Sequence, residues 1–285
     1  MKFHTDDHFV IGADHVSQGK PCQDYALSGL HGDMAYAVVS DGCSSGGLTD
    51  VGSRLMSLST VAAMRELWST AGRMQNDAAE EIDLRQRIIL GGVKETLRIT
   101  RNDMLATCAF IYMTPQGGII HLRGDGVLAI VGRDGHIGLY RFDWANNRPF
   151  YPAYIDDNYQ SFIKAHGADV SVKALTSEVW VMRPDEEHVA TLTHSIEDGI
   201  KGITLKISVN DLAYVAVFTD GVTQVDGMDW KRSTADLLAF KSIEGVFAKR
   251  RMNAFIKSSQ KIGRGPLDDI AMAVVRVEHG IEEKK

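Results

Sequence analysis

The chain has 285 residues, of which 44% are hydrophobic and 24% are charged, and its formal net charge is -6. The length allows one large domain or two smaller ones, and the composition excludes wholesale disorder and collagen-like repeats. The negative charge argues against nucleic acid as the main partner. No apolar run approaches the roughly 20 residues of a membrane span. The N-terminal sequence MKFHTDDHF lacks the pattern of a signal peptide, and three scattered cysteines predict no disulfide framework, so we expect a cytoplasmic protein.

The first third of the chain predicts one buried strand and two helices. The apolar run 34–40 (MAYAVVS) has the length of a strand that is buried on both faces, and it ends at Asp41-Gly42. After a glycine-containing loop, apolar residues at steps of four, three and four predict an amphipathic helix over 51–68. A second apolar stripe predicts a helix over about 76–101, with Gly91-Gly92 as a weak point.

The middle of the chain is rich in predicted strands. A turn at 114–117 joins two apolar runs into a hairpin. The strands are expected at 107–113, 118–122, 127–131 and 136–142. The region of about 144–202 carries a cluster of aromatic residues and predicts only one strand, near 179–182, before another at 203–209.

The last third repeats the pattern of the first. A fully apolar run at 212–219 ends at Asp220-Gly221, helices are predicted over 234–240 and 243–259, and Asp268-Asp269 opens a last strand at 270–277. Because strands and helices do not alternate regularly, a doubly wound parallel sheet is not expected, and the fold class is α+β with antiparallel strands.

Aspartates are unusually frequent, with 25 Asp against 12 Glu, and six of them are followed by glycine. Three Asp-Gly pairs, at 134, 198 and 226, have polar flanks and are typical of turns. The others differ in their setting, because Asp41 and Asp220 end apolar strands and Asp125 precedes one.

Aspartates at the ends of apolar strands can converge at one edge of a stack of sheets. Several carboxylates so close repel one another unless a cation neutralises them, and hard oxygen ligands suit Mg²⁺ or Mn²⁺. Two such ions sharing one water make it a nucleophile for attack at phosphorus. Spacing alone leaves open the alternative that these are independent turns.

Five motifs, in order, carry a resemblance to a known family. They are KPCQDY around Asp24, VVSDG around Asp41, RGDG around Asp125, FTDGV around Asp220, and LDDIAMAVV near the end. The series resembles the metal-dependent protein phosphatases of the type-2C (PPM) superfamily over about residues 10–277. It is most similar to a compact bacterial branch whose first motif reads SH-x-x-G-x-x-C-Q-D, with Asp14 here in place of the first Ser.

The resemblance implies a fold and a domain organisation. The family fold is a four-layer α-β-β-α sandwich, in which two antiparallel sheets are flanked by helix pairs. Residues 1–285 would then form a single catalytic domain, with about 144–202 as a variable insertion or flap. A monomer is expected.

The resemblance also implies metal ligands for two Mn²⁺ or Mg²⁺ ions and a third, weaker one. Asp41 would bridge two ions, Asp24 would orient a metal-bound water, and Asp269 would stand behind the last ligand, where the family usually has Asn. The implied metal set is Asp24, Asp41, the carbonyl of Gly42, Asp125, Asp220 and Asp268.

Two positions depart from the family pattern. Many members have His directly after the first Asp-Gly, where this chain has Cys43; a thiol can donate a proton, but a small cysteine packed beside the loop is the alternative. Many members also bind the substrate phosphate with an Arg about five residues before the first Asp. Here Gly19 holds that place with Lys20 adjacent, so Lys20 either binds phosphate as a point charge or is simply solvated. His15 either joins this pocket or is structural.

The expected function is hydrolysis of phosphoserine and phosphothreonine in proteins by a water that two metal ions activate, with Asp41, Asp24, Lys20 and Cys43 as the catalytic residues. Phosphorylated proteins are the expected partners, together with an opposing Ser/Thr kinase. Two alternatives stay open. One is a pseudophosphatase or phosphoprotein-binding module, and the other is a metal-dependent phosphoesterase that acts on small metabolites.

Overall fold

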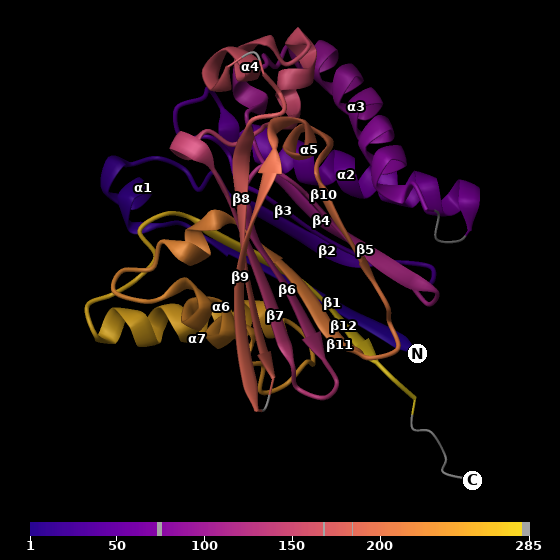
Figure 1. Cartoon of the computed structure of the whole chain (residues 1–285), viewed down its shortest axis with the longest axis vertical. Coiled ribbons are helices and arrows are strands. Elements are labelled where there is room, and N and C mark those ends of the chain that lie inside the picture. The colour runs from indigo at the N-terminus through magenta and orange to yellow at the C-terminus, as the bar shows by residue number, and fades with distance from the viewer. Residues whose placement is uncertain (73–75, 168, 184, 281–285) are drawn as a thin grey trace.

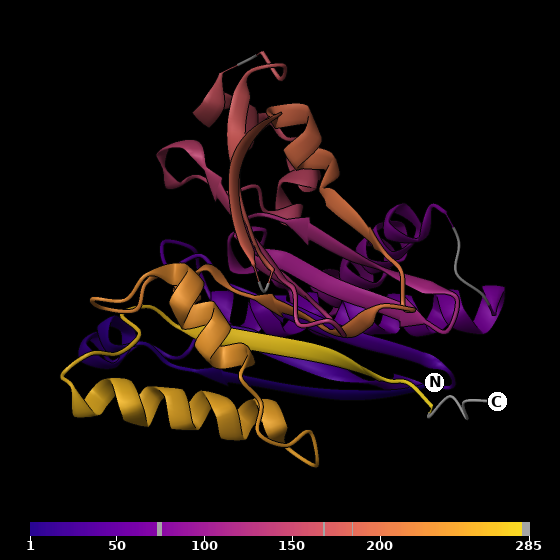
Figure 2. The same cartoon turned by 60° about the horizontal axis from the view of Figure 1, so that its bottom comes forward.

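Two antiparallel sheets stack face to face and helices cover their outer surfaces (Figures 1 and 2). The computed structural model describes residues 1–72, 76–167, 169–183 and 185–280. This arrangement confirms the predicted α+β class and the four-layer sandwich. That the region of about 144–202 is a variable insertion in a single domain stays a prediction.

The larger sheet has seven strands in the order β1-β12-β11-β6-β7-β8-β9, and every neighbouring pair is antiparallel. Its strands are β1 (Lys2–Val10), β6 (Gly126–Gly132), β7 (Ile137–Trp144), β8 (Lys173–Arg183), β9 (Glu186–Ser195), β11 (Leu212–Phe218) and β12 (Ile270–Glu278).

The smaller sheet has five strands in the order β10-β5-β4-β3-β2, again all antiparallel. Its strands are β2 (Tyr25–His31), β3 (Met34–Ser40), β4 (Cys108–Thr114), β5 (Gly117–Arg123) and β10 (Ile203–Ile207). The predicted hairpin in the middle of the chain is therefore β4–β5.

A helix pair covers each sheet on its outer side. Helices α2 and α3 pack on the five-stranded sheet, and α6 and α7 pack on the seven-stranded sheet (Figure 2). The α-helices are α1 (Ala13–Gln18), α2 (Thr49–Ala71), α3 (Ala78–Leu97), α4 (Gln160–His166), α5 (Ile196–Lys201), α6 (Trp230–Leu238) and α7 (Phe247–Lys261). Short 3₁₀ helices are η1 (Asn102–Met104), η2 (Ala145–Asn147), η3 (Pro152–Asp157) and η4 (Asp220–Thr223).

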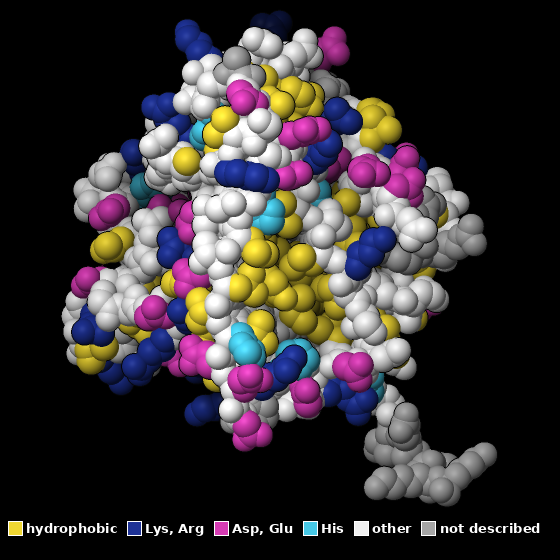
Figure 3. Space-filling view, viewed as in Figure 1, with side chains coloured by type: hydrophobic (Ala, Val, Ile, Leu, Met, Phe, Trp, Pro, Cys, Tyr) yellow, Lys and Arg dark blue, Asp and Glu magenta, His cyan; other side chains and the backbone are white. Residues whose placement is uncertain are grey.

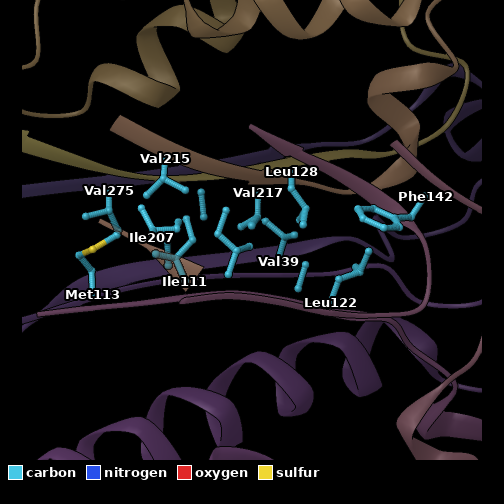
Figure 4. Close-up of a cluster of buried hydrophobic side chains, with 14 of the residues drawn as sticks. Val39, Ile111, Met113, Leu122, Leu128, Phe142, Ile207, Val215, Val217 and Val275 are labelled. Atoms are coloured by element: carbon cyan, nitrogen blue, oxygen red, sulfur yellow. The ribbon is translucent and has the colours of Figure 1, made fainter. Parts of the chain in front are cut away.

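The central core lies between the two sheets, where apolar side chains from both interdigitate (Figure 4). Strand β3 is buried at all seven positions. Alternate side chains point to opposite faces of a strand, so Val39 joins the core between the sheets, whereas Val38 packs beneath α2 and α3. This confirms that the apolar run is a strand buried on both faces.

Several elements of the fold have no counterpart in the sequence-based predictions, among them α4 and α5. Elements β1, α1 and β2 were not predicted, because β1 is polar and its side chains are mostly half-buried, without a clean alternation. The strand predicted near 179–182 is part of a long hairpin of β8 and β9. Strand β9 carries mainly exposed side chains at the edge of the sheet, so no apolar pattern marks it.

The sandwich is open on the face seen in Figures 1 and 3. Hydrophobic side chains gather near the centre of this face, with charged side chains around them (Figure 3). Ile130 and His136 line two adjoining hollows of about 160 and 420 Å³. None of the helices in the described residues is both long and apolar enough to cross a membrane.

Candidate active site

The central strands of the seven-stranded sheet bring three distant segments together at one end. Phe218, the last residue of β11, lies opposite Val127 of β6 and Met272 of β12. The end of β11 and the starts of β6 and β12 are therefore neighbours. The residues that flank these ends are Asp125, Asp220 and Asp268.

The five-stranded sheet places two further aspartates at the same end of the sandwich. Tyr25 pairs with Ser40, so Asp24 precedes β2 beside Asp41 at the end of β3. Thr107 fixes Asp41 from the neighbouring strand: its N–H donates to the Asp41 carbonyl (2.8 Å) and its Oγ1 accepts from the Asp41 N–H (3.0 Å). The backbone of Asp41 is thus held on both sides.

The converging strand ends enclose a cavity of about 210 Å³. Four aspartates line it, and no Lys or Arg is among the described residues that do so. The lining residues are His15, Asp41, Gly42, Cys43, Ser44, Ser45, Asp125, Asn147, Pro149, Tyr151, Asp220, Gln224 and Asp268. The lining of the cavity is therefore strongly acidic.

Close backbone contacts distinguish the glycines of the cavity from those of ordinary turns. A Cβ at Gly42 would lie 2.5 Å from the carbonyl oxygen of Thr49, and one at Gly221 would lie 1.8 Å from that of Asp269. Gly126 has φ +137°, where other residues are strained. In contrast, a Cβ at Gly135 would meet nothing within 4 Å. Three of the six Asp-Gly pairs therefore belong to the packing of the site.

Burial and mutual repulsion raise the pKa values of Asp41, Asp125 and Asp220. Burial is the main cause for Asp41, followed by the charges of Asp24, Asp220 and Asp125. Burial and then the charge of Asp220 raise the pKa of Asp125, and burial with the charge of Asp268 raises that of Asp220 to about 6. Asp125 is 8% exposed, and its Oδ1 is buried without a hydrogen-bond partner. These ligands fit a divalent cation, which would relieve the repulsion.

Asp24 lies behind the cavity rather than in its wall. It is 2% exposed and accepts a hydrogen bond from Thr219 Oγ1 (2.5 Å). Burial raises the pKa of Asp24, and the charges of Asp269 and Asp220 raise it further, against the opposing effect of Thr219. Asp24 therefore interacts electrostatically with aspartates of the cavity such as Asp220. Its role as a residue that orients a metal-bound water stays a prediction.

Asp269 is held by three donors. Its carboxylate accepts from the N–H of Gly12 (2.7 Å), from the N–H of Gln23 (2.6 Å) and from His15 Nδ1 (2.9 Å). Its own N–H donates to Asp268 Oδ1 (2.8 Å). Ligand atoms of His15, Asp268 and Asp269 all lie within 4.8 Å of one another. Asp269 thus ties the start of α1 and the segment before β2 to the strand end that carries Asp268.

Gln224 lines the cavity but was not identified as a site residue from the sequence. Its Nε2 donates to Asp220 Oδ2 (2.9 Å) and lies 3.3 Å from Asp268 Oδ2. It stands four residues after Asp220, and η4 turns it back onto the carboxylates. That spacing is the signal that could have identified it. Tyr151 and Asn147 were also missed, because they come from the segment after β7 and no local motif marks them.

Comparison with known protein families shows which family the chain belongs to. The sequence profile described as protein phosphatase 2C matches residues 11–257. The chain belongs to this family. The resemblance that the five motifs carry is thereby confirmed, and membership of the protein phosphatase 2C family supports phosphatase activity. A search of curated proteins found no match to this chain.

Solved structures with the same fold come from bacterial phosphatases. Serine/threonine phosphatase Stp1 from Staphylococcus aureus is 11% identical, with a TM-score of 0.56 over 98% of this chain and 96% of that one. The Mycobacterium tuberculosis serine/threonine phosphatase PstP/Ppp is 12% identical, with a TM-score of 0.54 over 98% of this chain and 100% of that one. At these identities the likeness concerns the fold of the protein phosphatase 2C family.

The two departures from the family pattern differ in where they lie. Cys43 lines the cavity, its thiol lies 3.2 Å from Ser45 Oγ, and its N–H donates to the carbonyl of Leu105 (2.8 Å). Lys20 is half-buried and donates its N–H to the His15 carbonyl (3.0 Å), but it is not among the described residues that line the cavity. The catalytic roles of both residues stay predictions.

Proposed function

We propose that this chain is a Mn²⁺- or Mg²⁺-dependent phosphatase that hydrolyses phosphoserine and phosphothreonine in proteins. The observation that carries the proposal is the acidic cavity. Asp41, Asp125, Asp220 and Asp268 line about 210 Å³ without a Lys or Arg among the described lining residues. A family of phosphatases matches 11–257, which contains three of these four aspartates.

The proposed metal ligands are Asp41, the carbonyl of Gly42, Asp125, Asp220 and Asp268, with Asp24 behind them. When bound, two divalent ions would activate a water as the nucleophile and neutralise charge on the phosphoryl oxygens. The residues of the chain keep these ligands apart and oriented. Thr107 fixes the backbone of Asp41, and Gln224 Nε2 donates to Asp220 in the same cavity. Such preorganisation lowers the cost of binding the ions and of reaching the transition state.

Release of phosphate from a phosphothreonine peptide tests the proposal. The wild-type protein is expected to turn over with Mn²⁺ and to stop when EDTA removes it. Asp41→Asn and Asp220→Asn keep the shape of the side chain but remove its charge, and each should lower kcat by about 10²- to 10³-fold. Asp226→Asn is the matched control, because Asp226 belongs to an exposed Asp-Gly pair outside the cavity and should leave turnover unchanged. Wild-type turnover in both cavity variants contradicts the proposal.

The same assay separates the two alternatives. Cys43 in place of the family's usual His, and the missing Arg of the family pattern, motivate a pseudophosphatase or phosphoprotein-binding module as the second candidate. That module would bind the phosphopeptide in calorimetry without metal and without turnover. A metabolite phosphoesterase would instead turn over small phosphate esters faster than the peptide. A phosphatase that acts on proteins implies an opposing Ser/Thr kinase.

A further inference from the structure

Tyr151 enters the cavity from a part of the chain that supplies none of the carboxylates. It lies between Phe150, which is fully buried, and Pro152, which opens η3. Its side chain lines the cavity, and the residue is 8% exposed. The cavity therefore has a wall that approaches the strand ends from the segment after β7.

Packing ties this wall to Asp41. The Phe150 ring meets Phe162 edge-on, with 5.1 Å between the ring centroids. The Phe150 carbonyl oxygen lies 3.3 Å from the place of a Cβ on Gly124, and the Thr107 side chain lies 2.6 Å from that same place. Thr107 in turn hydrogen-bonds the Asp41 backbone. A chain of neighbouring residues, Gly124 and then Thr107, thus connects the backbone beside Tyr151 with the backbone of Asp41.

Tyr151 differs from the other neutral hydrogen-bond donors of the cavity in its burial and in its hydrogen bonding. Ser44, Ser45 and Asn147 are exposed, whereas the amide of Gln224 donates to Asp220. An ordinary phenol keeps its proton through the physiological pH range, so Tyr151 brings a hydrogen-bond donor to the cavity that it lines.

We infer that Tyr151 is a catalytic residue whose hydroxyl donates a hydrogen bond to the leaving oxygen of the substrate, an inference that rests on the proposed phosphatase function. Hydrolysis forms a bond between the water oxygen and phosphorus and breaks the bond between phosphorus and the serine or threonine oxygen. That oxygen leaves with the bonding electron pair and finally carries a proton that comes from the attacking water. The hydrogen bond from Tyr151 stabilises the charge that grows on it, while the tyrosine keeps its own proton.

The test compares two leaving groups in the Mn²⁺-loaded protein. Tyr151→Phe removes one oxygen and leaves the ring. On a phosphothreonine peptide, whose alkoxide is strongly basic, kcat should fall by about 100-fold. On p-nitrophenyl phosphate, whose leaving group is a weak base, kcat should fall by less than about threefold. Tyr154→Phe is the matched control, since its ring lies 5.6 Å from that of Tyr151 and outside the cavity lining; it should preserve both rates.

Two further measurements keep the outcome decisive. Calorimetric titration with Mn²⁺ should give wild-type affinity in Tyr151→Phe, which excludes damage to the carboxylates. Tyr151→His supplies an N–H donor and should recover part of the peptide rate. An equal fall on both substrates, or no fall on the peptide, overturns the inference. Failure of the wild-type protein on both substrates would instead overturn the proposed function itself, before any variant is compared.

Discussion

Two groups of buried carboxylates in this protein differ in what surrounds them. Asp83 of α3 is 4% exposed, and its Oδ2 lies 2.7 Å from Arg123 Nη2 and 3.4 Å from His121 Nε2. Burial acts to raise the pKa of Asp83, but the charges of His121 and Arg123 outweigh it and hold the pKa below its ordinary value. In the cavity, burial and neighbouring acids act in the same direction and raise the pKa of Asp41.

We expect this difference in surroundings to distinguish Asp83, a carboxylate with a structural role, from the cavity aspartates, for which we propose a functional role. The chain supplies the counter-charges of Asp83 from β5, so that the group joins α3 to the five-stranded sheet. No Lys or Arg is among the described residues that line the cavity, so we expect most of the counter-charge of its aspartates to come from solution. Ionisation of Asp83 therefore raises the free energy of unfolding. Ionisation of Asp220 or Asp41 lowers it in the metal-free protein.

The largest expected effect concerns Asp83, whose charge is balanced by Arg123 and His121. Asp83→Ala leaves the guanidinium of Arg123 buried without its partner and should lower the free energy of unfolding by about 3 to 5 kcal/mol. Urea denaturation followed by circular dichroism measures it. Asp226→Ala, at an exposed turn, is the control and should change the free energy of unfolding by less than about 0.5 kcal/mol. A loss at Asp83 no larger than that of the control would mean that the ion pairs contribute little.

The next largest expected effect concerns the cavity aspartates, which have no Lys or Arg among the described residues beside them in the cavity lining. Mn²⁺ at 100 times its dissociation constant should raise the free energy of unfolding by about 2.7 kcal/mol, because it binds the folded cavity and not the unfolded chain. Asp220→Asn should lose most of this increment, whereas Asp83→Ala should retain it. Denaturation with and without EDTA gives the numbers. Equal increments in both variants would show that Mn²⁺ binds elsewhere.

The smallest expected effect is a pH dependence of the metal-free protein. The pKa of Asp220 is raised to about 6 from 3.8, so between these values the folded state binds more protons than the unfolded state. The free energy of unfolding should therefore fall as the pH rises from about 4 to about 6 and level off above. The fall should be less than about 3 kcal/mol for this residue, because one pKa unit corresponds to about 1.4 kcal/mol and water screens the half-buried carboxylate. Asp220→Asn should reduce that fall in urea titrations with EDTA. An unchanged slope would show that Asp220 is not the residue responsible.

The fold was predictable where apolar periodicity and burial agree. Strands β3 and β11 follow from fully apolar runs, and the β4–β5 hairpin follows from two such runs around a turn. Strand β1 was not predicted because its pattern reflects partners that sequence does not reveal: Asp7 accepts from Ser28, and Asp6 accepts from the first turn of α7. The polar side chains of β1 are satisfied by tertiary contacts.

The parts of the site that the sequence could indicate are its carboxylates and the residues within the same motifs, such as Gly42 and Cys43. Asp41, Asp125 and Asp220 stand out because Asp-Gly follows or precedes an apolar strand. Gln224 lies four residues after Asp220, yet its role depends on the turn of η4. Tyr151 depends on the packing of Phe150 against Gly124, which joins positions 26 residues apart. Local sequence patterns carry no information on such contacts.

Phe150 has a further consequence for how substrates enter. Its side chain is part of the core between the two sheets, together with Val39 and Val217 from the strands that end at the cavity. Lifting the Tyr151 wall away would expose this ring to water, so the wall and the aspartates form one cooperative unit. The backbone amide of Tyr154, which donates to the Tyr151 carbonyl (2.9 Å), should accordingly exchange its hydrogen as slowly as the amides of β3 and β11. We therefore expect that the segment at 150–151 stays in place when substrates enter the cavity.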